Sequence, residues 1–388
     1  MSVALALLGA AVLGPAAVYA AAMVRFCRAW QQLPALQPAP ARQVHKSDGF
    51  ALTVIVAARN EAANLPCLLA DLSQQTYLMD GGSAEVIIVD DHSTDATPAI
   101  VQQAALASPF ALRLVQLASL PQQPTGKKAA VQAAVAAARA PWVVLTDADC
   151  RVAPGWLEAH AAVAADHTAQ FASGPVLLTG QGMLAALQGV ELAALVGVGA
   201  AGIGLGRPTM CNGANLSYRR AAFYTVHGFA GNAHVPSGDD EFLLHKLHAA
   251  YPTGIHFLKE AAAIVRTSAQ PTLRALLRQR VRWASKWQHY EQAAPRRLAV
   301  LVLLANVGLF AGLVSLFWLP HGWPLVLAAW GVKLGADVWF LLPVLGFFRR
   351  QPWLRWLPVL QLAYAPYALA TGLLGLRGGY EWKGRRVK

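Results

Sequence analysis

The sequence predicts an α/β fold: a doubly wound, mostly parallel sheet joined to one N-terminal and about three C-terminal membrane helices. Two observations lead to this prediction. The 388 residues are 56% hydrophobic and only 13% charged, which is more apolar than a soluble protein usually is. Between the apolar ends of the chain, strand-like and helix-like segments alternate from residue 51 to residue 150, as they do when helices connect parallel strands.

Four continuous apolar stretches are each close to the roughly 20 residues that span a bilayer. They cover residues 3–24, 298–319, 323–348 and 354–376. The first could instead be a cleaved signal peptide, but it lacks a basic start, is too long, and is followed by Arg25 and Arg28. We therefore expect an uncleaved anchor.

A fifth apolar stretch covers residues 183–206. It contains Gln188 and Glu191, and it lies between two motifs that we expect to share one site. A membrane crossing here would put these motifs on opposite sides of the membrane. We therefore predict a buried or interfacial helix and loop.

The net charge of +12 comes largely from arginine and lysine beside the apolar stretches, which favours lipid headgroups as partners. No zinc-finger, RNP or basic-zipper pattern is present, so we expect no nucleic-acid partner. Arg25, Arg28, Arg296 and Arg297 predict that the polar middle of the chain is cytoplasmic, in a multi-pass protein of the cell (inner) membrane. The four cysteines are widely spaced without a CxxC pair, as is usual in a reducing compartment.

The predicted boundaries follow from these segments. We expect an anchor over 1–28, a linker over 29–48, a cytoplasmic globular domain over 49–272, an amphipathic interface helix over 273–297, membrane helices over 298–376 and a basic tail over 377–388. Three crossings after residue 297 would put the tail outside, whereas Pro358 and Pro366 would allow a re-entrant hairpin that returns it to the cytoplasm, which we favour. Lys333 and Asp337, four residues apart, are expected to form an ion pair within one helix.

The globular domain begins with alternating elements. Strands are expected over 51–58, 84–91 and, as the third strand, 141–150; helices are expected over 59–75, over 92–106 with a cap near Ser93 and Thr94, and over 127–140. Ligands of such sheets bind beyond the carboxyl ends of the strands. Those ends carry Arg59, Asn60, Glu61, Asp90, Asp91, Asp147 and Asp149.

Asp147 and Asp149 alternate with one alanine, so on an extended segment both point the same way and suit a hard cation. A strand-end turn is the alternative. Gly126, Lys127 and Lys128 begin a helix whose N-terminus favours anions, although a solvated lysine pair is equally possible. The Walker pattern is absent, so this is no P-loop.

These motifs, in their order, resemble the inverting nucleotide-sugar glycosyltransferases of family 2, which have the GT-A fold. The resemblance covers about residues 50–290. The matching stretches are AARNEA (57–62), VDDHSTD (89–95), GKKAAV (126–131), TDADC (146–150), CNGANLSYRRAAF (211–223), SGDDEFLL (237–244) and QRVRW (279–283). The helices at both ends are similar to membrane-bound members such as ceramide glucosyltransferases and polysaccharide synthases.

The resemblance implies a role for each motif. It implies Asp240 as the catalytic base, and Asp149 with Asp147 as ligands of Mg²⁺ or Mn²⁺. A helix N-cap made by Asp239 or Asp240 is a structural alternative. Contacts to the nucleotide-sugar donor and the acceptor are implied for Arg59, Glu61, Asp90, Asp91, Lys127, Asp147, Asp239, Gln279, Arg280, Arg282 and Trp283.

The predicted enzyme is a hexosyltransferase that adds a sugar to a lipid or lipid-linked acceptor. The helix that carries Gln279, Arg280, Arg282 and Trp283 is also expected to lie in the headgroup plane. Two other functions stay open. One is a processive polysaccharide synthase, which three or four helices serve poorly because it needs a channel. The other is a non-catalytic membrane protein with a degenerate domain, against which the intact aspartates argue.

Overall fold

The computed structural model describes residues 2–35, 49–233, 235, 237–286, 290, 292–376, 380–382 and 385–387. The predicted linker therefore lies largely outside the described residues, as does part of the basic tail. The chain forms two compact units. The helical unit comprises Met1–Gln32, Gly180–Arg207 and Ala269–Tyr380; the sheet unit comprises Leu33–Thr179, Pro208–Ser268 and Glu381–Lys388. The helical unit thus includes residues 180–207, which the predicted continuous domain over 49–272 contained.

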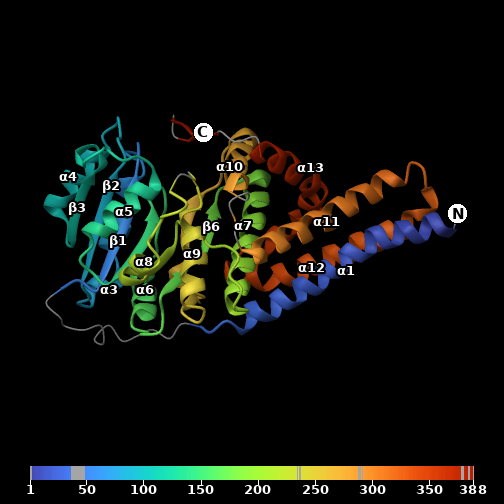
Figure 1. Ribbon diagram of the computed structural model, residues 1–388, viewed down its shortest axis with the longest axis horizontal. Helices are drawn as coiled ribbons and strands as arrows, with labels where there is room; N and C mark the ends of the chain where they lie inside the picture. Colours follow the sequence, from blue (N-terminus) through green and yellow to red (C-terminus); the bar gives the residue numbers. More distant parts are fainter. Residues whose placement is uncertain are drawn as a thin grey trace. The chain divides into compact units, whose positions relative to one another are not determined.

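The sheet unit is built on one mixed sheet (Figure 1). In the described residues, seven strands have the order β3-β2-β1-β4-β7-β5-β8. They are β1 (Leu52–Ala58), β2 (Ala84–Asp90), β3 (Ala111–Gln116), β4 (Trp142–Asp147), β5 (Phe171–Ser173), β7 (Leu216–Arg219) and β8 (Ile255–Phe257). Strands β1 to β4 are parallel and β7 is antiparallel to β4. Two further pairs are β6 (Val176–Thr179) with β9 (Val265–Ser268), and β10 (Tyr380–Trp382) with β11 (Arg385–Val387).

The sequence prediction missed four strands of this sheet, which are β3, β5, β7 and β8. We expected residues 141–150 to form the third strand, but β3 precedes it and Trp142–Asp147 is the fourth. Strand β3 lies at the sheet edge, and most of its residues are only half buried. An edge strand of this kind lacks the continuous apolar run that identifies β1, β2 and β4.

The helices of the sheet unit are interspersed with its strands along the chain. They are α2 (Leu65–Ser73), α3 (Thr76–Met79), α4 (Thr97–Ala107), α5 (Lys127–Ala137), α6 (Trp156–Ala164), α8 (Arg220–Thr225) and α9 (Asp239–Ala250), with short 3₁₀ turns at Leu117–Ser119 and Ala261–Ala263. The predicted cap at Ser93 and Thr94 is wrong, because α4 begins only at Thr97. The Asp95 carboxylate accepts a hydrogen bond from the Thr97 N–H instead (3.0 Å).

A buried polar network lies in the core of the sheet unit. The Asn215 side chain donates to the carbonyl oxygens of Pro175 (2.8 Å) and Ala263 (2.7 Å). Its Oδ1 lies 3.0 Å from Trp156 Nε1 and 3.1 Å from His160 Nε2. Because an unpaired buried amide is costly, these four contacts explain why a polar residue is tolerated at a position with no solvent exposure.

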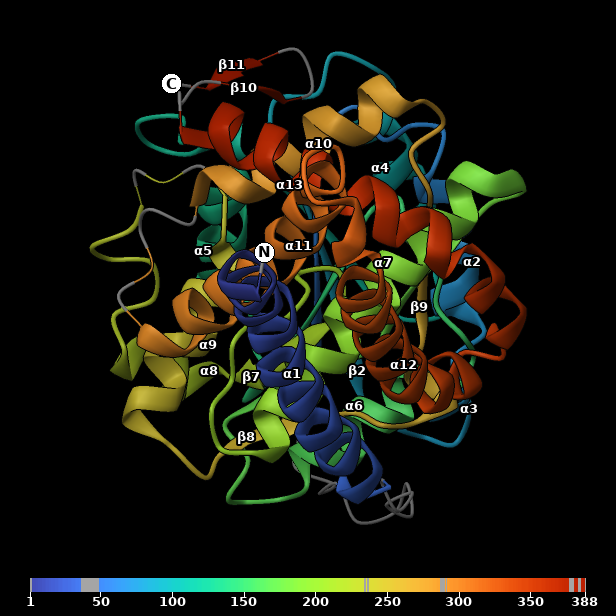
Figure 2. The ribbon, with the colours of Figure 1, turned by 90° about the vertical axis from the view of Figure 1, so that its right-hand side faces the viewer.

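The helical unit contains the long apolar helices. They are α1 (Ser2–Gln32), α7 (Gly182–Gly204), α11 (Ala293–Ser315), α12 (Trp323–Phe347) and α13 (Leu357–Leu376), with α10 (Leu273–Ser285) and 3₁₀ turns at Pro320–Gly322 and Gln351–Trp356. Helix α1 packs against α11 and α12, and Figure 2 shows α1 beside α12. Among the described residues, five helices are long and apolar enough to cross a membrane: α1, α7, α11, α12 and α13.

Two expectations about these helices change. In the stretch 183–206, nearly all residues belong to helix α7, which ends at Gly204, and the loop is only a short turn. The predicted burial is confirmed, because 61% of the most apolar part of α7 is buried, against at most 39% in the other four helices. Residues 357–376 also form one continuous helix, so the re-entrant hairpin is wrong. Pro358 lies in the first turn, where no helical N–H partner is needed, and Pro366 is accommodated inside the helix.

The predicted pair of Lys333 and Asp337 is confirmed. Lys333 Nζ lies 2.8 Å from Asp337 Oδ2, and the Tyr19 hydroxyl on α1 donates to Asp337 Oδ1 at 2.5 Å. All three side chains are buried. The pair therefore also joins α12 to α1.

Candidate active site

The carboxyl ends of three adjacent strands meet at one edge of the sheet. In the register of β1 with its neighbours, Ala58 pairs with Asp90 of β2, and Ala57 pairs with Asp147 of β4. Because parallel strands end on the same side, both aspartates flank the end of β1. The loops that follow these strands therefore surround one region, as the sequence pattern predicts.

The loops after β1 and β2 are joined by hydrogen bonds. The Arg59 guanidinium donates to the backbone oxygens of Asp91 (2.8 Å) and His92 (3.2 Å). Glu61 is 5% exposed and accepts from the Asn64 amide at 2.6 Å. Asn60 accepts from the Thr94 N–H at 2.8 Å. In the structure, Arg59 and Glu61 thus shape the loops, and a direct contact of either with a substrate stays a prediction.

Asp90 and Asp91 are buried at the end of β2. Both oxygens of Asp90 lie 3.3 Å from the Ser93 N–H. Asp91 Oδ2 accepts from the Gly126 N–H at 3.0 Å, and its Oδ1 lies 3.2 Å from His92 Nδ1. Asp91 therefore connects the end of β2 to the N-terminus of α5.

Lys127 is the first residue of α5 and contacts two carboxylates. Its Nζ donates to Asp147 Oδ1 at 2.5 Å and lies 3.9 Å from Asp239 Oδ2. Burial alone would lower the pKa of Lys127, but Asp147 and Asp239 outweigh this effect and hold the pKa above its ordinary value. The ammonium thus stays charged where an anionic substrate group would need it.

Lys128 does not form the solvated pair that was one reading of the sequence. Its side chain is 9% exposed, and its Nζ donates to the backbone oxygens of Asn232 (2.5 Å) and Val235 (2.7 Å). Sequence reasoning missed this role. Its partners are backbone atoms more than 100 residues away, and no local pattern reports them.

Asp239 and Asp240 lie in the first turn of α9. The N-cap is Gly238, whose φ of 80° favours glycine, so the alternative that either aspartate caps the helix is wrong. Burial raises the pKa of Asp239, and Asp240 and Asp147 raise it further, while Lys127 opposes them. Asp240 Oδ2 accepts from the Gly213 N–H at 2.8 Å. A side chain at Gly213 would lie 3.1 Å from Lys127 Nζ and 3.4 Å from Asp240 Oδ2.

Two carboxylates, those of Asp147 and Asp149, lie at the end of β4, where a metal ion could bind together with substrate phosphates. Asp149 is exposed, and the Asp147 carboxylate is about one third exposed. In the part of the chain that the structure describes, no three His, Cys, Asp or Glu side chains form a metal-binding group. Mg²⁺ and similar ions are commonly held by one or two carboxylates with substrate phosphates. The carboxylates of Asp147 and Asp149 therefore fit a divalent ion, and Asp147 also pairs with Lys127.

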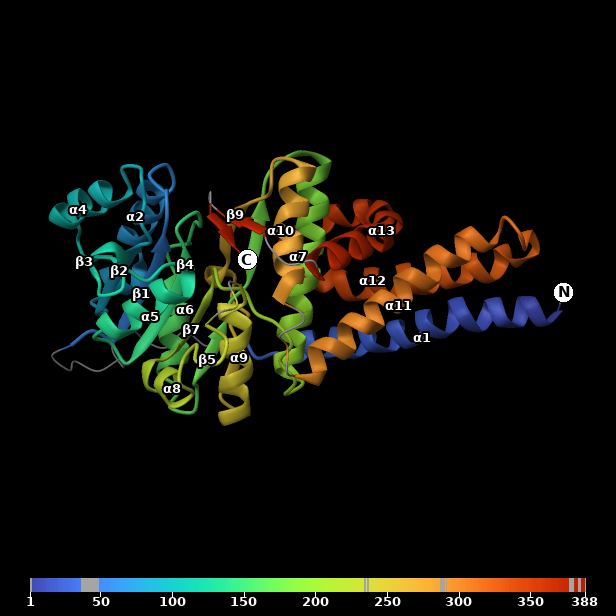
Figure 3. The ribbon, with the colours of Figure 1, turned by 45° about the horizontal axis from the view of Figure 1, so that its top comes forward.

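The QRVRW residues lie on α10, in the helical unit. Figure 3 shows α10 beside α7, and Arg280 is paired with Glu191 of α7: its Nε and Nη2 lie 3.0 and 2.7 Å from Glu191 Oε2. Arg280 is 5% exposed and also contacts the ring of Trp283. Arg280 is thus engaged within its own unit, and substrate contacts of Gln279, Arg280, Arg282 and Trp283 stay predictions.

Comparison with protein families decides what this arrangement belongs to. The family described as "Glycosyl transferase family 2" matches residues 53–195, and "Glycosyl transferase family group 2" matches residues 142–369, more than half of the chain. The chain belongs to the family 2 glycosyltransferases. The family resemblance of the sequence motifs is therefore confirmed, and so is the enzyme class.

Two solved structures are similar to this glycosyltransferase. The mannosyltransferase PcManGT of Pyrobaculum calidifontis is 22% identical, with 95% of this chain and 97% of that chain covered and a TM-score of 0.56. Glucosyl-3-phosphoglycerate synthase of Mycobacterium tuberculosis is 20% identical over 59% of this chain and 75% of that chain, with a TM-score of 0.40. The first likeness confirms the fold class, a GT-A-like α/β domain with apolar helices at both ends of the chain.

One curated relative matches a shorter stretch. The succinoglycan biosynthesis protein ExoO of Rhizobium meliloti (strain 1021) is 35% identical over 103 residues. The match covers 26% of the glycosyltransferase chain and 26% of ExoO, so about a quarter of that relative's length is represented.

In this glycosyltransferase, the sheet unit brings together seven of the predicted site residues. Direct hydrogen bonds or ion pairs join Lys127 to Asp147 and Asp239, and Arg59 to Asp91. Asp240 is adjacent to Asp239, and Asp90 is adjacent to Asp91. Gly126 and Gly213 complete the cluster through their N–H groups, and neither was among the predicted site residues.

Proposed function

We propose that this chain is a membrane-bound inverting glycosyltransferase that moves a sugar from a nucleotide-diphosphate sugar to a lipid or lipid-linked acceptor. The main support is that the Lys127 ammonium contacts the carboxylates of Asp147 and Asp239, and that Asp240 directly follows Asp239. Carboxylates from β4 and α9 thus surround one cation at the edge where ligands of α/β sheets bind.

Asp240 is the proposed base. One oxygen removes the proton of the acceptor hydroxyl while the hydroxyl oxygen bonds to the anomeric carbon. The bond from that carbon to the diphosphate breaks on the opposite face, so the configuration inverts and the nucleoside diphosphate leaves with the electron pair. The Gly213 N–H holds Asp240 Oδ2 at 2.8 Å and so orients the carboxylate for this transfer.

Lys127 is the proposed partner of the donor diphosphate. Its ammonium lies at the N-terminus of α5, where backbone N–H groups also favour anions. A bound Mg²⁺ or Mn²⁺ on Asp149 and Asp147 would stabilise charge on the departing diphosphate. Arg59, Glu61, Asp90 and Asp91 are proposed to form the base and ribose pocket. The mannosyltransferase of similar fold is described in complex with GDP-Man and Mn²⁺, which supports a nucleotide sugar and Mn²⁺ here.

We propose a lipid acceptor because the helical unit has the surface of a membrane-embedded protein. Apolar side chains are exposed along α1, α11, α12 and α13, as expected where lipid surrounds a protein. The basic segments favour a cell (inner) membrane location with the sheet unit in the cytoplasm. A processive polysaccharide synthase is the second candidate, because the matched relative is a succinoglycan biosynthesis protein.

Radiolabelled nucleotide sugars and membranes that contain the enzyme separate these functions. A chloroform-soluble product is expected for the lipid acceptor, and a labelled high polymer would favour the synthase instead. No labelled product with any donor would contradict both.

Two variants test the residue roles. Asp240→Asn should lower transfer at least about a thousandfold and leave donor binding within a factor of two, because only the base is lost. Asp149→Ala should weaken Mn²⁺-dependent donor binding about tenfold or more. Turnover near that of the wild type in Asp240→Asn would refute the base assignment.

A further inference from the structure

The chain reaches Asp240 through an irregular segment, residues 226–238, which we call the approach segment. Its described residues form turns rather than helix or strand. The Ala230 N–H donates to His227, the Asn232 N–H to Phe229, and the Val235 N–H to Asn232. Such turns leave carbonyl oxygens that need other partners when they are buried.

Two lysine side chains supply those partners. Lys128 of α5 donates to the carbonyl oxygens of Asn232 and Val235, at 2.5 and 2.7 Å. Lys246 of α9 donates to those of Gly228 (2.8 Å) and Ala230 (2.6 Å), and lies 3.5 Å from that of Val226. Five carbonyl oxygens of one segment therefore contact two ammonium groups.

The surroundings of Lys128 strengthen these bonds. Its side chain is 9% exposed, and its Nζ lies 5.1 Å from the ring centre of Phe242 and 6.0 Å from that of Phe229. Water is largely excluded, so the hydrogen bonds to the carbonyl oxygens are stronger than at the surface. Phe242 is two residues beyond Asp240 on α9, so Lys128 contacts both the approach segment and the helix it leads into.

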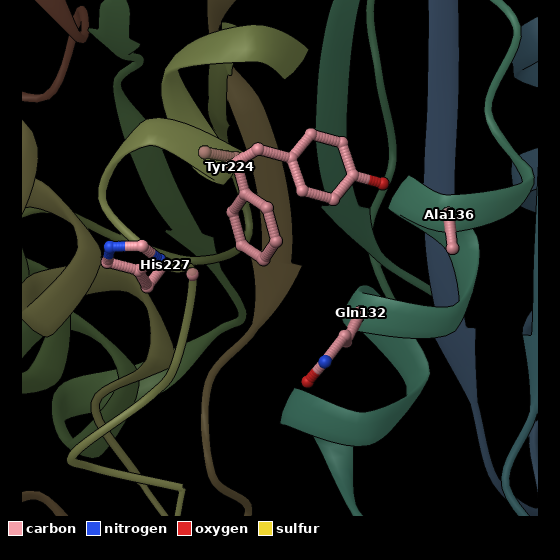
Figure 4. Close-up of a pocket in the computed structure, with 6 residues that line it drawn as sticks. Gln132, Ala136, Tyr224 and His227 are labelled. Carbon is pink, nitrogen blue, oxygen red and sulfur yellow. The ribbon is translucent and has the colours of Figure 1, made fainter.

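At His227 and Gly228, the beginning of the segment faces a pocket beside α5. This pocket has a volume of about 320 Å³ and is lined by Gln132, Ala136, Phe223, Tyr224, His227 and Gly228. Figure 4 shows Gln132 and Ala136 of α5 across this pocket from Tyr224 and His227. Beyond this pocket, the hydrogen bonds of Lys128 attach the segment to α5, and Phe229 and Val235 of the segment are buried.

We propose that Lys128 is a positioning residue for sugar transfer: it fixes the approach segment and thereby the place of Asp240. This inference rests on the proposed role of Asp240 as base. Lys128 directly follows Lys127, so the first turn of α5 would hold the donor diphosphate with one lysine and the base-bearing segment with the next. A displacement of a catalytic group by about 1 Å can cost about a hundredfold in rate, which makes such an attachment consequential.

Lys128→Met in the full-length enzyme tests the proposal. Methionine suits the apolar surroundings but leaves two carbonyl oxygens without a donor. We expect kcat to fall about tenfold or more, while the affinity for UDP or GDP, whichever the wild type binds with Mn²⁺, changes less than about twofold. Hydrogen exchange measured by mass spectrometry should become faster in peptides of residues 226–238 and stay unchanged in β1, β2 and β4.

The controls separate positioning from other effects. Lys259→Met removes one lysine charge from the same unit outside the approach segment and should change neither kcat nor exchange in residues 226–238. Lys128→Arg keeps a buried cation and should retain more of the rate than Lys128→Met. Wild-type kcat in Lys128→Met, equal losses of kcat and nucleotide affinity, or faster exchange throughout the sheet would each overturn the proposal.

A double-variant cycle separates this proposal from the base assignment. If Lys128 acts through Asp240, adding Lys128→Met to Asp240→Asn should change the residual transfer rate less than about twofold. A full tenfold further loss would overturn the positioning role and leave the base assignment intact. If Asp240→Asn alone keeps wild-type turnover, the proposed function fails, and the exchange data still report whether Lys128 holds the segment.

Discussion

At the scale of single residues, the buried network around Asn215 makes a prediction about pH. His160 has no solvent exposure, and its Nδ1 lies 2.9 Å from Ser217 Oγ while its Nε2 faces Asn215. Burial lowers the pKa of His160 from 6.5 to about 4, although the hydrogen bond with Asn215 opposes the change. The folded protein therefore holds this ring neutral at a pH where the unfolded chain protonates it.

Because the pKa of His160 is lower in the folded protein than in the unfolded chain, acid should destabilise the folded protein. A folded pKa below the unfolded one means that the stabilisation is complete above pH 6.5 and is lost as pH falls toward 4. We expect about 3 kcal/mol of the free energy of unfolding to disappear over this range. His160→Gln can still donate to Asn215 but does not titrate, so its thermal unfolding in detergent should depend less on pH than that of the wild type. Parallel pH curves for the two proteins would contradict the prediction.

At the scale of helices and strands, the buried pair of Lys333 and Asp337 makes a second prediction. Lys333→Met should destabilise the helical unit by about 3 kcal/mol, because it leaves an unpaired carboxylate between α12 and α1. Lys333→Met combined with Asp337→Asn should recover most of this loss, since the amide oxygen still accepts from the Tyr19 hydroxyl. Unfolding by SDS in mixed micelles measures both. A double variant as unstable as the single one would show that the charge is not the cause.

Some of these helices and strands could be predicted from the sequence, and others could not. Strands β1, β2 and β4 are continuous apolar runs that end in polar residues, so their existence and their common edge could be predicted. Strand β3 could not, because it is a half-buried edge strand. The role of Lys128 was hidden for another reason: its partners are carbonyl oxygens, which every residue carries. The Arg280 pair with Glu191 also joins residues 89 apart.

At the scale of the whole molecule, the site constrains how the chain crosses the membrane. Asp147 precedes α7 and Asp239 follows it, yet both contact Lys127 within the sheet unit. A single crossing by α7 would put its two flanks on opposite sides of the membrane. Helix α7 is therefore expected to stay on one side, although its length and apolar character would allow it to cross.

The same reasoning applies to the C-terminus. The described residues 381–382 and 385–387 belong to the sheet unit, so an even number of crossings should separate them from residue 268. Helices α11, α12 and α13 are all long and apolar enough to cross a membrane, and α13 is the least apolar of the three. We predict that α13 does not cross and that the tail lies on the side of the sheet unit.

An impermeant thiol reagent checks this topology. Cys67, exposed on α2, reports the side of the sheet unit, and Val387→Cys reports the side of the tail. Neither thiol should react in intact cells, and both should react after permeabilisation, with the labelled peptides located by mass spectrometry. Reaction of the introduced thiol alone in intact cells would mean that all three helices cross.

The division of the chain into two units has a consequence for protein engineering. Because residues 180–207 interrupt the sheet unit in sequence, a fragment trimmed only at its ends would still carry the 23-residue apolar helix Gly182–Gly204. A water-soluble version would instead need an internal excision, with a connector from Thr179 to Pro208 that replaces the span of a helix roughly 35 Å long.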